Sequence, residues 1–106
     1  MQVVVDMTTE PGAVGLDDPG DCGRFHVTVR GDGDSAALDR ALRAADVGEV
    51  DGDGEALVRV AAVRRLAAGS VGASWGEDFA AMLEYARSKG WLSDDGAAIR
   101  AHVERG

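Results

Sequence analysis

Residues 74–91, with the sequence SWGEDFAAMLEYARSKGW, predict a long helix in the C-terminal part of this chain. Ser74 and Glu77 have the spacing of a capping box, in which each side chain bonds to the backbone of the other residue. Acidic residues stand near the start of this segment and basic residues near its end, as the helix dipole favours. Gly90 is typical of a residue that ends a helix, and we expect Trp91 to fold back on the last turn.

Four of the five aromatic residues of the chain lie in this segment. The apolar residues that share one stripe of the predicted helix are Trp75, Phe79, Met82, Leu83 and Ala86. Tyr85 lies off this stripe, and we expect it to be the most exposed aromatic residue. Because exposed tyrosine and tryptophan are common anchors of protein interfaces, Tyr85 and Trp91 are the predicted partner-binding residues.

Two strands are predicted in the N-terminal part of the chain. Residues 3–8 are rich in β-branched side chains, and residues 24–30 place an apolar side chain at every second position. Residues 9–23, between these strands, are rich in Gly, Pro and Asp. They predict one long acidic loop.

A helix is predicted after the second strand. Asp34 or Ser35 is placed to cap its start, and two leucines share one stripe of its surface. Asp39 and Arg43 are four positions apart, a spacing that favours an ion pair. We expect this helix to end between residues 46 and 48.

Residues 50–55, VDGDGE, carry two Asp-Gly steps, which are the strongest short signal of a hairpin turn. We expect a short strand before this turn and a longer strand, over residues 56–60, after it. The region also resembles the first half of an EF-hand calcium loop, but Val60 stands where that loop needs a bidentate glutamate. A hairpin turn is therefore predicted, and a weak cation site at Asp51 and Asp53 is the alternative.

Residues 61–69 change to a helical spacing and end in glycine, which predicts a short helix. One continuous helix over residues 55–68 is the alternative. It is disfavoured because its apolar residues drift around the axis while its arginines fall on several sides. Ser93 is placed to cap a last helix over residues 94–104.

The predicted order is strand, strand, helix, strand, strand, helix, helix, helix. This order and the length of 106 residues predict a single α+β domain over residues 1–106. We expect a small antiparallel sheet of about four strands with the helices packed on one face.

The chain is acidic, with 19 Asp and Glu against 11 Lys and Arg and a net charge of -8. Such a field repels nucleic acid and anionic membrane surfaces, so neither is an expected partner. The single cysteine, Cys22, has no partner for an intramolecular disulfide, and the sequence shows no leader and no apolar run of membrane-spanning length. We therefore expect a cytoplasmic protein.

Arg24, His26 and Arg30 alternate along the second predicted strand and share its polar face. They are the predicted ligand-binding residues for a small anionic ligand. If this face is catalytic, His26 is the acid or base and the arginines hold an anionic substrate. The alternative is a solvated strand face whose arginines pair with Asp6 or Glu10. No metal site and no cofactor are predicted.

Residues 86–92, ARSKGWL, and residues 98–104, AIRAHVE, resemble the end of short uncharacterised actinobacterial proteins. This resemblance implies a lineage and brings no catalytic motif with it.

The sequence as a whole predicts a non-enzymatic binding module that contacts another protein or a second copy of the chain. The contact surface is either the exposed part of the aromatic helix or the polar face of the second strand. The alternative is a small ligand-binding domain or enzyme that uses Arg24, His26 and Arg30 to hold an anionic substrate.

Overall fold

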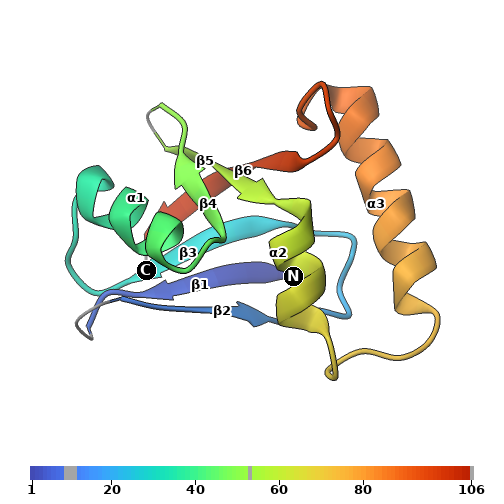
Figure 1. Ribbon diagram of the computed structural model, residues 1–106, viewed down its shortest axis with the longest axis horizontal. Coiled ribbons are helices and arrows are strands. Elements are labelled where there is room, and N and C mark those ends of the chain that lie inside the picture. Colours follow the sequence, from blue (N-terminus) through green and yellow to red (C-terminus); the bar gives the residue numbers. More distant parts are fainter. Residues whose placement is uncertain (9–11, 53, 106) are drawn as a thin grey trace.

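The computed structural model describes residues 1–8, 12–52 and 54–105, and this part of the chain forms an α+β fold with six strands and three helices (Figure 1). The strands are β1 (Gln2–Asp6), β2 (Ala13–Asp17), β3 (His26–Arg30), β4 (Gly48–Val50), β5 (Glu55–Arg59) and β6 (Ala98–Arg105). The helices are α1 (Ser35–Ala44), α2 (Val60–Ala67) and α3 (Trp75–Lys89).

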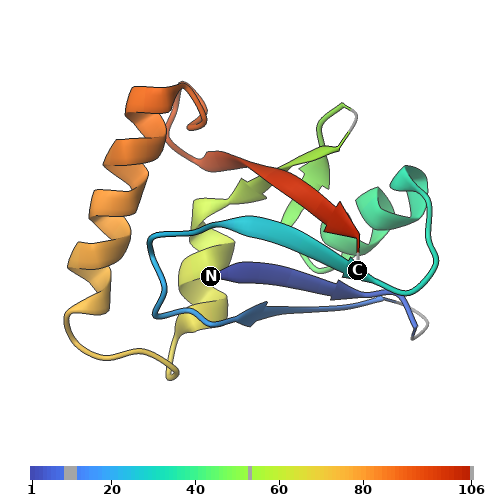
Figure 2. The same ribbon diagram turned by 180° about the vertical axis from the view of Figure 1, so that it is seen from behind.

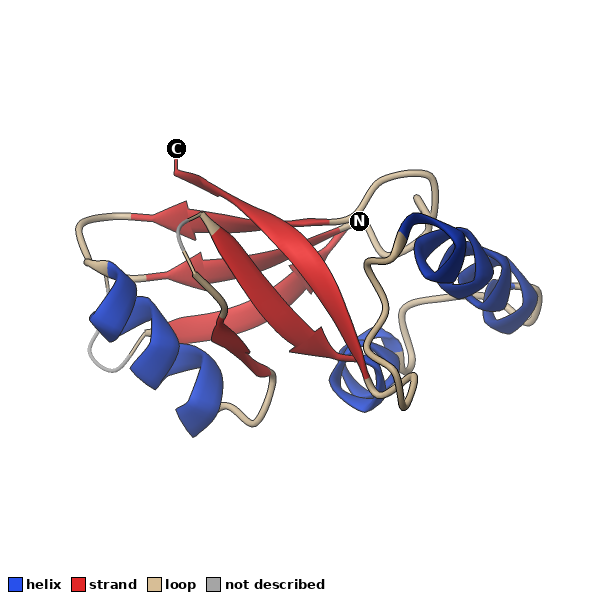
Figure 3. Cartoon of the chain, turned by 90° about the horizontal axis from the view of Figure 1, so that it is seen from above, coloured by secondary structure: helices blue, strands red, loops and turns tan. Residues whose placement is uncertain are grey.

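The strands form one curled, half-barrel sheet in the order β2-β1-β3-β6-β5-β4 (Figure 3). The pairs β1–β3 and β3–β6 are parallel, whereas β1–β2, β5–β6 and β4–β5 are antiparallel. The expected antiparallel sheet of about four strands was therefore wrong. The chain crosses from β2 to the far side of β1 before it forms β3, and that crossing makes the first parallel pair.

One face of the sheet carries the hydrophobic core. Val3 and Val5 of β1 and Val27 and Val29 of β3 are buried, while the residues between them are partly exposed. Helices α1 and α2 lie on this side of the sheet (Figure 3). The other side, seen in Figure 2, has none of the described helices over it. The expectation that helices cover one face thus holds for α1 and α2.

Residues 98–104, expected to be helical, form most of strand β6. Ile99 and Ala101 are buried, whereas Arg100 and His102 are exposed, and this alternation is the period of a strand. Ser93 does not cap a helix: its hydroxyl donates to Asp95 and accepts from the Ala98 N–H, which closes a turn before the strand. Residues 98–102 pair with β5 and residues 103–105 pair with β3, and this pairing favours a strand over a helix.

The expected loop over residues 9–23 contains strand β2. Its first three residues, 9–11, lie outside the described residues. Val14 and Leu16 pack against the core, and β2 pairs with β1 in antiparallel register from Gln2 opposite Asp17 to Asp6 opposite Ala13. An alternation of two apolar residues around a glycine is too short to distinguish a strand from a loop in the sequence alone.

Helix α3 stands beyond one end of the sheet, apart from α1 and α2 (Figure 1). Its predicted end is confirmed: Gly90 adopts a left-handed conformation with φ of 78°, and the Trp91 N–H donates to the Ala86 carbonyl at 2.9 Å. The predicted capping box was wrong, because Ser74 already has a helical backbone and its side chain caps none of the described N–H groups. Among the described residues, no helix is both long enough and apolar enough to cross a membrane.

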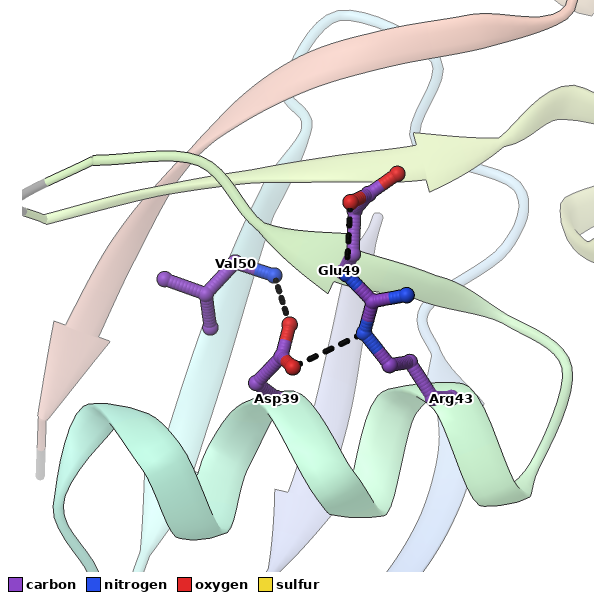
Figure 4. A network of polar contacts seen from close by, with 4 residues as sticks. All are labelled: Asp39, Arg43, Glu49 and Val50. Atoms are coloured by element: carbon purple, nitrogen blue, oxygen red, sulfur yellow. Dashed lines mark hydrogen bonds and ion pairs between the residues drawn. The ribbon is translucent and has the colours of Figure 1, made fainter.

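The predicted cap and ion pair of α1 and the predicted hairpin of β4 and β5 are confirmed, but α1 ends at Ala44, before the expected residues 46–48. Asp34 accepts the Ala37 N–H at 2.8 Å at the start of α1. Asp39 accepts the Val50 N–H at 2.9 Å and binds Arg43 at 2.8 Å, which ties the helix to β4 (Figure 4). Residues 55–59 form β5 and only then does α2 begin, so the alternative of one helix over residues 55–68 is excluded.

The calcium-loop-like segment begins at Glu49, and its described carboxylates at Glu49 and Asp51 bind arginines. Glu49 pairs with Arg43 at 2.8 Å, and Asp51 pairs with Arg100 at 2.9 Å. Asp53 lies outside the described residues. No group of three or more His, Cys, Asp or Glu side chains gathers as a metal-binding cluster in the described ranges.

We expect Asp39→Asn to lower the resistance to urea at neutral pH and the difference from the parent chain to shrink in acid. In the folded chain the Val50 N–H, followed by Arg43, lowers the pKa of the Asp39 carboxyl. Such a group contributes stability above its unfolded pKa of about 3.9 and loses this contribution as pH falls through the folded pKa. Urea unfolding of both proteins from about pH 7 to pH 2 measures it. A difference that stays constant over this range would contradict the assignment.

Candidate functional site

The structure separates the three residues that the sequence placed on one strand face. Strand β3 begins at His26, so exposed Arg24 lies in the segment before the strand. Arg30 lies at the other end of β3, about 20 Å from Arg24 along an extended chain. There the Thr8 hydroxyl and, more weakly, the charge of Arg30 lower the pKa of Asp6. Glu10, the other expected partner of the arginines, lies outside the described residues.

His26 belongs to a hydrogen-bonded network on the open face of the sheet. Its Nε2 lies 3.1 Å from Gln2 Oε1 and 3.5 Å from Glu104 Oε2. The Thr28 hydroxyl donates to the same Gln2 oxygen, and the Gln2 amide donates to Asp17 at 3.0 Å. The two acceptors next to Nε2 favour the tautomer with its proton on that nitrogen. The network links β1, β2, β3 and β6 through their side chains.

A groove of about 690 Å³ lies between α3 and the segment that leads into β3. Its walls include Arg24, Phe25, Met82, Tyr85, Trp91 and Arg100. The segment before β3 faces α3 in both side views (Figures 1 and 2). Trp75 fixes this arrangement at one end, because its indole N–H donates to the Pro19 carbonyl at 2.7 Å. The groove therefore brings predicted residues of both candidate surfaces into one place.

Two exposed aromatic rings mark this groove. Tyr85 is 57% exposed and Trp91 is 45% exposed, as the sequence predicted for these two rings. They meet edge to face, with ring centroids 5.9 Å apart and planes at 68°. The turn at Gly90 positions Trp91 against α3, since its backbone is bonded to the last turn of that helix. The amine of Lys89 lies 5.5 Å from the centre of the Tyr85 ring.

The charged residues of the groove fall into two groups. Arg100 is bound by Asp51, and Asp21 accepts the Gly23 N–H at 3.1 Å. Arg24 and Asp78 line the groove from opposite sides, and neither forms an ion pair or a side-chain hydrogen bond with any of the described residues. The groove thus offers one cation and one anion whose pairing capacity is unused.

Cys22 also lines the groove and is partly buried. Burial and then the nearby charge of Asp78 raise the pKa of its thiol, so the thiolate that nucleophilic chemistry needs is disfavoured at neutral pH. Cys22 therefore contributes a small apolar side chain to the wall of the groove.

Comparisons with protein-family models, curated proteins and solved structures gave no match.

A second, smaller cavity of about 330 Å³ lies beside β4. Its charged residues pair with each other: Arg43 with Glu49 at 2.8 Å and Arg59 with Asp46. With these charges already neutralised, the cavity has less to offer a ligand than the groove beside α3.

Asp78 and Arg100 are groove residues that the sequence does not predict. Asp78 has the position of a first-turn acid of α3, and Arg100 lies in the segment expected to be helical, which forms β6 instead. The strand alternation over residues 98–105 would have shown Arg100 to be exposed. No sequence signal places it beside Trp91, because that proximity depends on the turn between α3 and β6 and on the pairing of β6.

Proposed function

We propose that this chain is a non-enzymatic binding module whose recognition surface is the groove between α3 and the segment before β3. Exposed Trp91 and Tyr85, set edge to face beside a groove of about 690 Å³, carry this proposal. Large aromatic rings supply much contact area for little loss of conformational entropy, and they are enriched among interface anchors. The ligand is a segment of a protein, held by apolar contact with these rings and by polar contact with Arg24.

The open face of the sheet is a poorer candidate for the recognition surface than the groove. His26 lies there in contact with Gln2 and Glu104, and Arg24 and Arg30 lie apart from each other at the two ends of that region. A general acid or base needs a substrate site within hydrogen-bond reach and groups that orient the substrate. The groove brings exposed aromatic rings and Arg24 together, whereas the side chains around His26 already hydrogen-bond to one another.

We expect peptides selected on the immobilised chain to bind in the groove, with Trp91→Ala weakening their affinity roughly tenfold or more, as is usual for an aromatic anchor. The measurement is calorimetry for affinity and amide chemical-shift mapping for location. Tyr85→Phe is the matched control, because it keeps the ring and removes a hydroxyl that bonds to none of the described residues. Peptides that shift the amides around His26 and bind Trp91→Ala normally would refute the proposal.

Binding of a small anion is the second candidate, favoured by the guanidinium of Arg24, which pairs with none of the described residues, and by Arg100 in the same groove. The volume lies within the range of small-molecule sites, roughly 300 to 1,000 Å³. The same shift mapping with inorganic phosphate and simple carboxylates separates the two candidates. Saturable shifts at Arg24 that Arg24→Gln abolishes would favour the anion, and absence of such shifts would leave the protein segment.

A further inference from the structure

We infer that the protein segment bound by the groove is α3 of a second copy of this chain, so that two copies form a symmetric dimer through α3 and the segment before β3. This inference rests on the proposed function, since it names the partner of the same groove. It is argued from the exposure of α3, from the distribution of charge along α3, and from the charges on the two groove walls.

Helix α3 is poorly covered by its own chain. Of its 15 residues, the buried ones are Trp75, Phe79 and Ala86. Helices in proteins are stabilised mainly by packing of an apolar face, and α3 stands beyond the end of the sheet (Figures 1 and 3). Ala81 and Tyr85 face the groove and are exposed. A second helix against this side would cover the apolar surface that the single chain leaves open.

The charges of α3 are arranged to pair with a second α3 in the opposite direction. Its first turn carries Glu77 and Asp78, and its last turn carries Arg87 and Lys89. A two-fold axis across the middle of the helix places the acidic end of each copy beside the basic end of the other, and the two helix dipoles then oppose each other. A parallel arrangement would set like charges side by side. The pattern therefore favours a two-fold symmetric contact.

The groove walls show the same self-complementarity. Arg24 stands on the segment before β3 and Asp78 stands on α3, and neither is paired with another described residue. In a two-fold contact the segment before β3 of one copy faces α3 of the other, so Arg24 of each copy lies opposite Asp78 of the other. The same ion pair therefore forms twice across the interface. The groove carries two arginines and two aspartates among its lining residues, so the contact surface itself is neutral although the whole chain carries -8.

The aromatic rings supply the centre of this contact. Tyr85 lies between the acidic and basic ends of α3, and Trp91, which follows the helix, folds back so that its ring meets that of Tyr85. Ala81, which also lines the groove, has a side chain small enough to let a second helix approach closely. An apolar centre with charged residues at its rim is the usual arrangement of a protein interface. The centre supplies the affinity, and the rim charges fix the orientation.

We expect sedimentation equilibrium of the full chain to show a monomer–dimer equilibrium with a dissociation constant of about 1–100 µM, typical of a small interface. Trp91→Ala should weaken the dimer roughly tenfold or more, and Arg40→Ala, at an exposed position outside the groove, should leave it unchanged. Far-ultraviolet circular dichroism confirms that each variant is folded. Because Trp91 is partly exposed and its backbone makes the contact with α3, its side chain can be removed without breaking that contact.

A charge-reversal cycle tests the orientation. Arg24→Asp and Asp78→Arg should each weaken the dimer, because each places like charges opposite one another at both symmetric positions. The double variant should restore it. Arg40→Asp and Asp32→Arg make the same charge changes on exposed residues outside the groove, and they should have no such effect.

The outcomes separate this inference from the proposed function. A chain that stays monomeric at about 0.5 mM, well above the expected dissociation constant, overturns the inference. If selected peptides still bind the groove in that case, the proposed function stands with another protein as partner. A dimer that is unaffected by Trp91→Ala and by both charge reversals also overturns the inference, since its interface lies elsewhere.

Discussion

Replacing Phe79 with alanine should lower the free energy of unfolding by about 4 kcal/mol. Replacement of a buried phenylalanine by alanine costs about 3 to 5 kcal/mol in other proteins. The Phe79 side chain is fully buried and stacks on Trp75, with ring centroids 4.7 Å apart and planes at 9°. The guanidinium of Arg64 lies 5.0 Å from the centre of the same ring. Phe79 thus anchors α3 to the hydrophobic core, and its loss leaves a cavity there. A domain of this size has about 5 to 15 kcal/mol of total stability, so the effect is large.

Urea unfolding followed by circular dichroism measures the effect of Phe79→Ala. The matched control is Tyr85→Ala, which removes an aromatic ring of the same helix at an exposed position. This control should change stability by less than about 1 kcal/mol. Equal losses in the two variants would show that α3 is not anchored through Phe79.

Replacing Gly48 with alanine should cost about 2 to 4 kcal/mol, because an added methyl group has no room beside β5. A Cβ atom at Gly48 would lie 2.1 Å from the Leu57 carbonyl oxygen and 3.1 Å from the Val58 Cα. These are backbone atoms of the paired strand, so β4 itself would have to move away from β5. The ladder between these two strands, and with it the contact of Asp39 with Val50, would be disturbed.

Gly15→Ala is the matched control for Gly48→Ala. Gly15 also lies in a strand at the edge of the sheet, but an added Cβ there meets no atom of the described residues within 4 Å. Alanine at this position should be neutral or stabilise the chain by up to about 1 kcal/mol, through the lower entropy of the unfolded state. Similar losses in both variants would mean that strand glycines matter here for a reason other than close approach.

The elements that the sequence predicted well are those whose boundaries depend on neighbouring residues. The cap at Asp34 and the glycine turn at Gly90 each satisfy backbone groups of their own helix. The Asp-Gly steps of the hairpin also act within a few residues. Such interactions are encoded locally, so a pattern of residue types is enough to find them.

The sheet was predicted poorly because its pairing joins distant parts of the chain. The alternation over residues 98–105 was visible, but the alanines at 98 and 101 also suit a helix, and the capping position of Ser93 favoured that reading. Its partners β3 and β5 decide the conformation, and no local signal names them. Strand direction also depends on where the chain crosses the sheet, so the parallel pairs were missed.

The candidate site was half predicted for the same reason. Exposure of Tyr85 and Trp91 follows from helical periodicity and from the turn at Gly90, both of which are local. The position of Arg24 opposite Asp78 depends on how α3 is placed beyond the sheet, which the Trp75 indole bond to Pro19 helps to fix. Such a bond links residues far apart in the sequence, so no local sequence pattern predicts it.

Strand β6 makes completion of the sheet a late event in folding. It lies between β3 and β5, which are not paired with each other, so it alone joins the β2-β1-β3 half to the β5-β4 half. Residues 98–105 are synthesised after every strand that they join. Until residues 98–105 leave the ribosome, the nascent chain has an unpaired strand edge at β3 and another at β5. Unpaired edges of this kind can pair with strands of other chains. The period in which a newly made copy can aggregate through these edges therefore lasts until β6 has left the ribosome and paired with both strands.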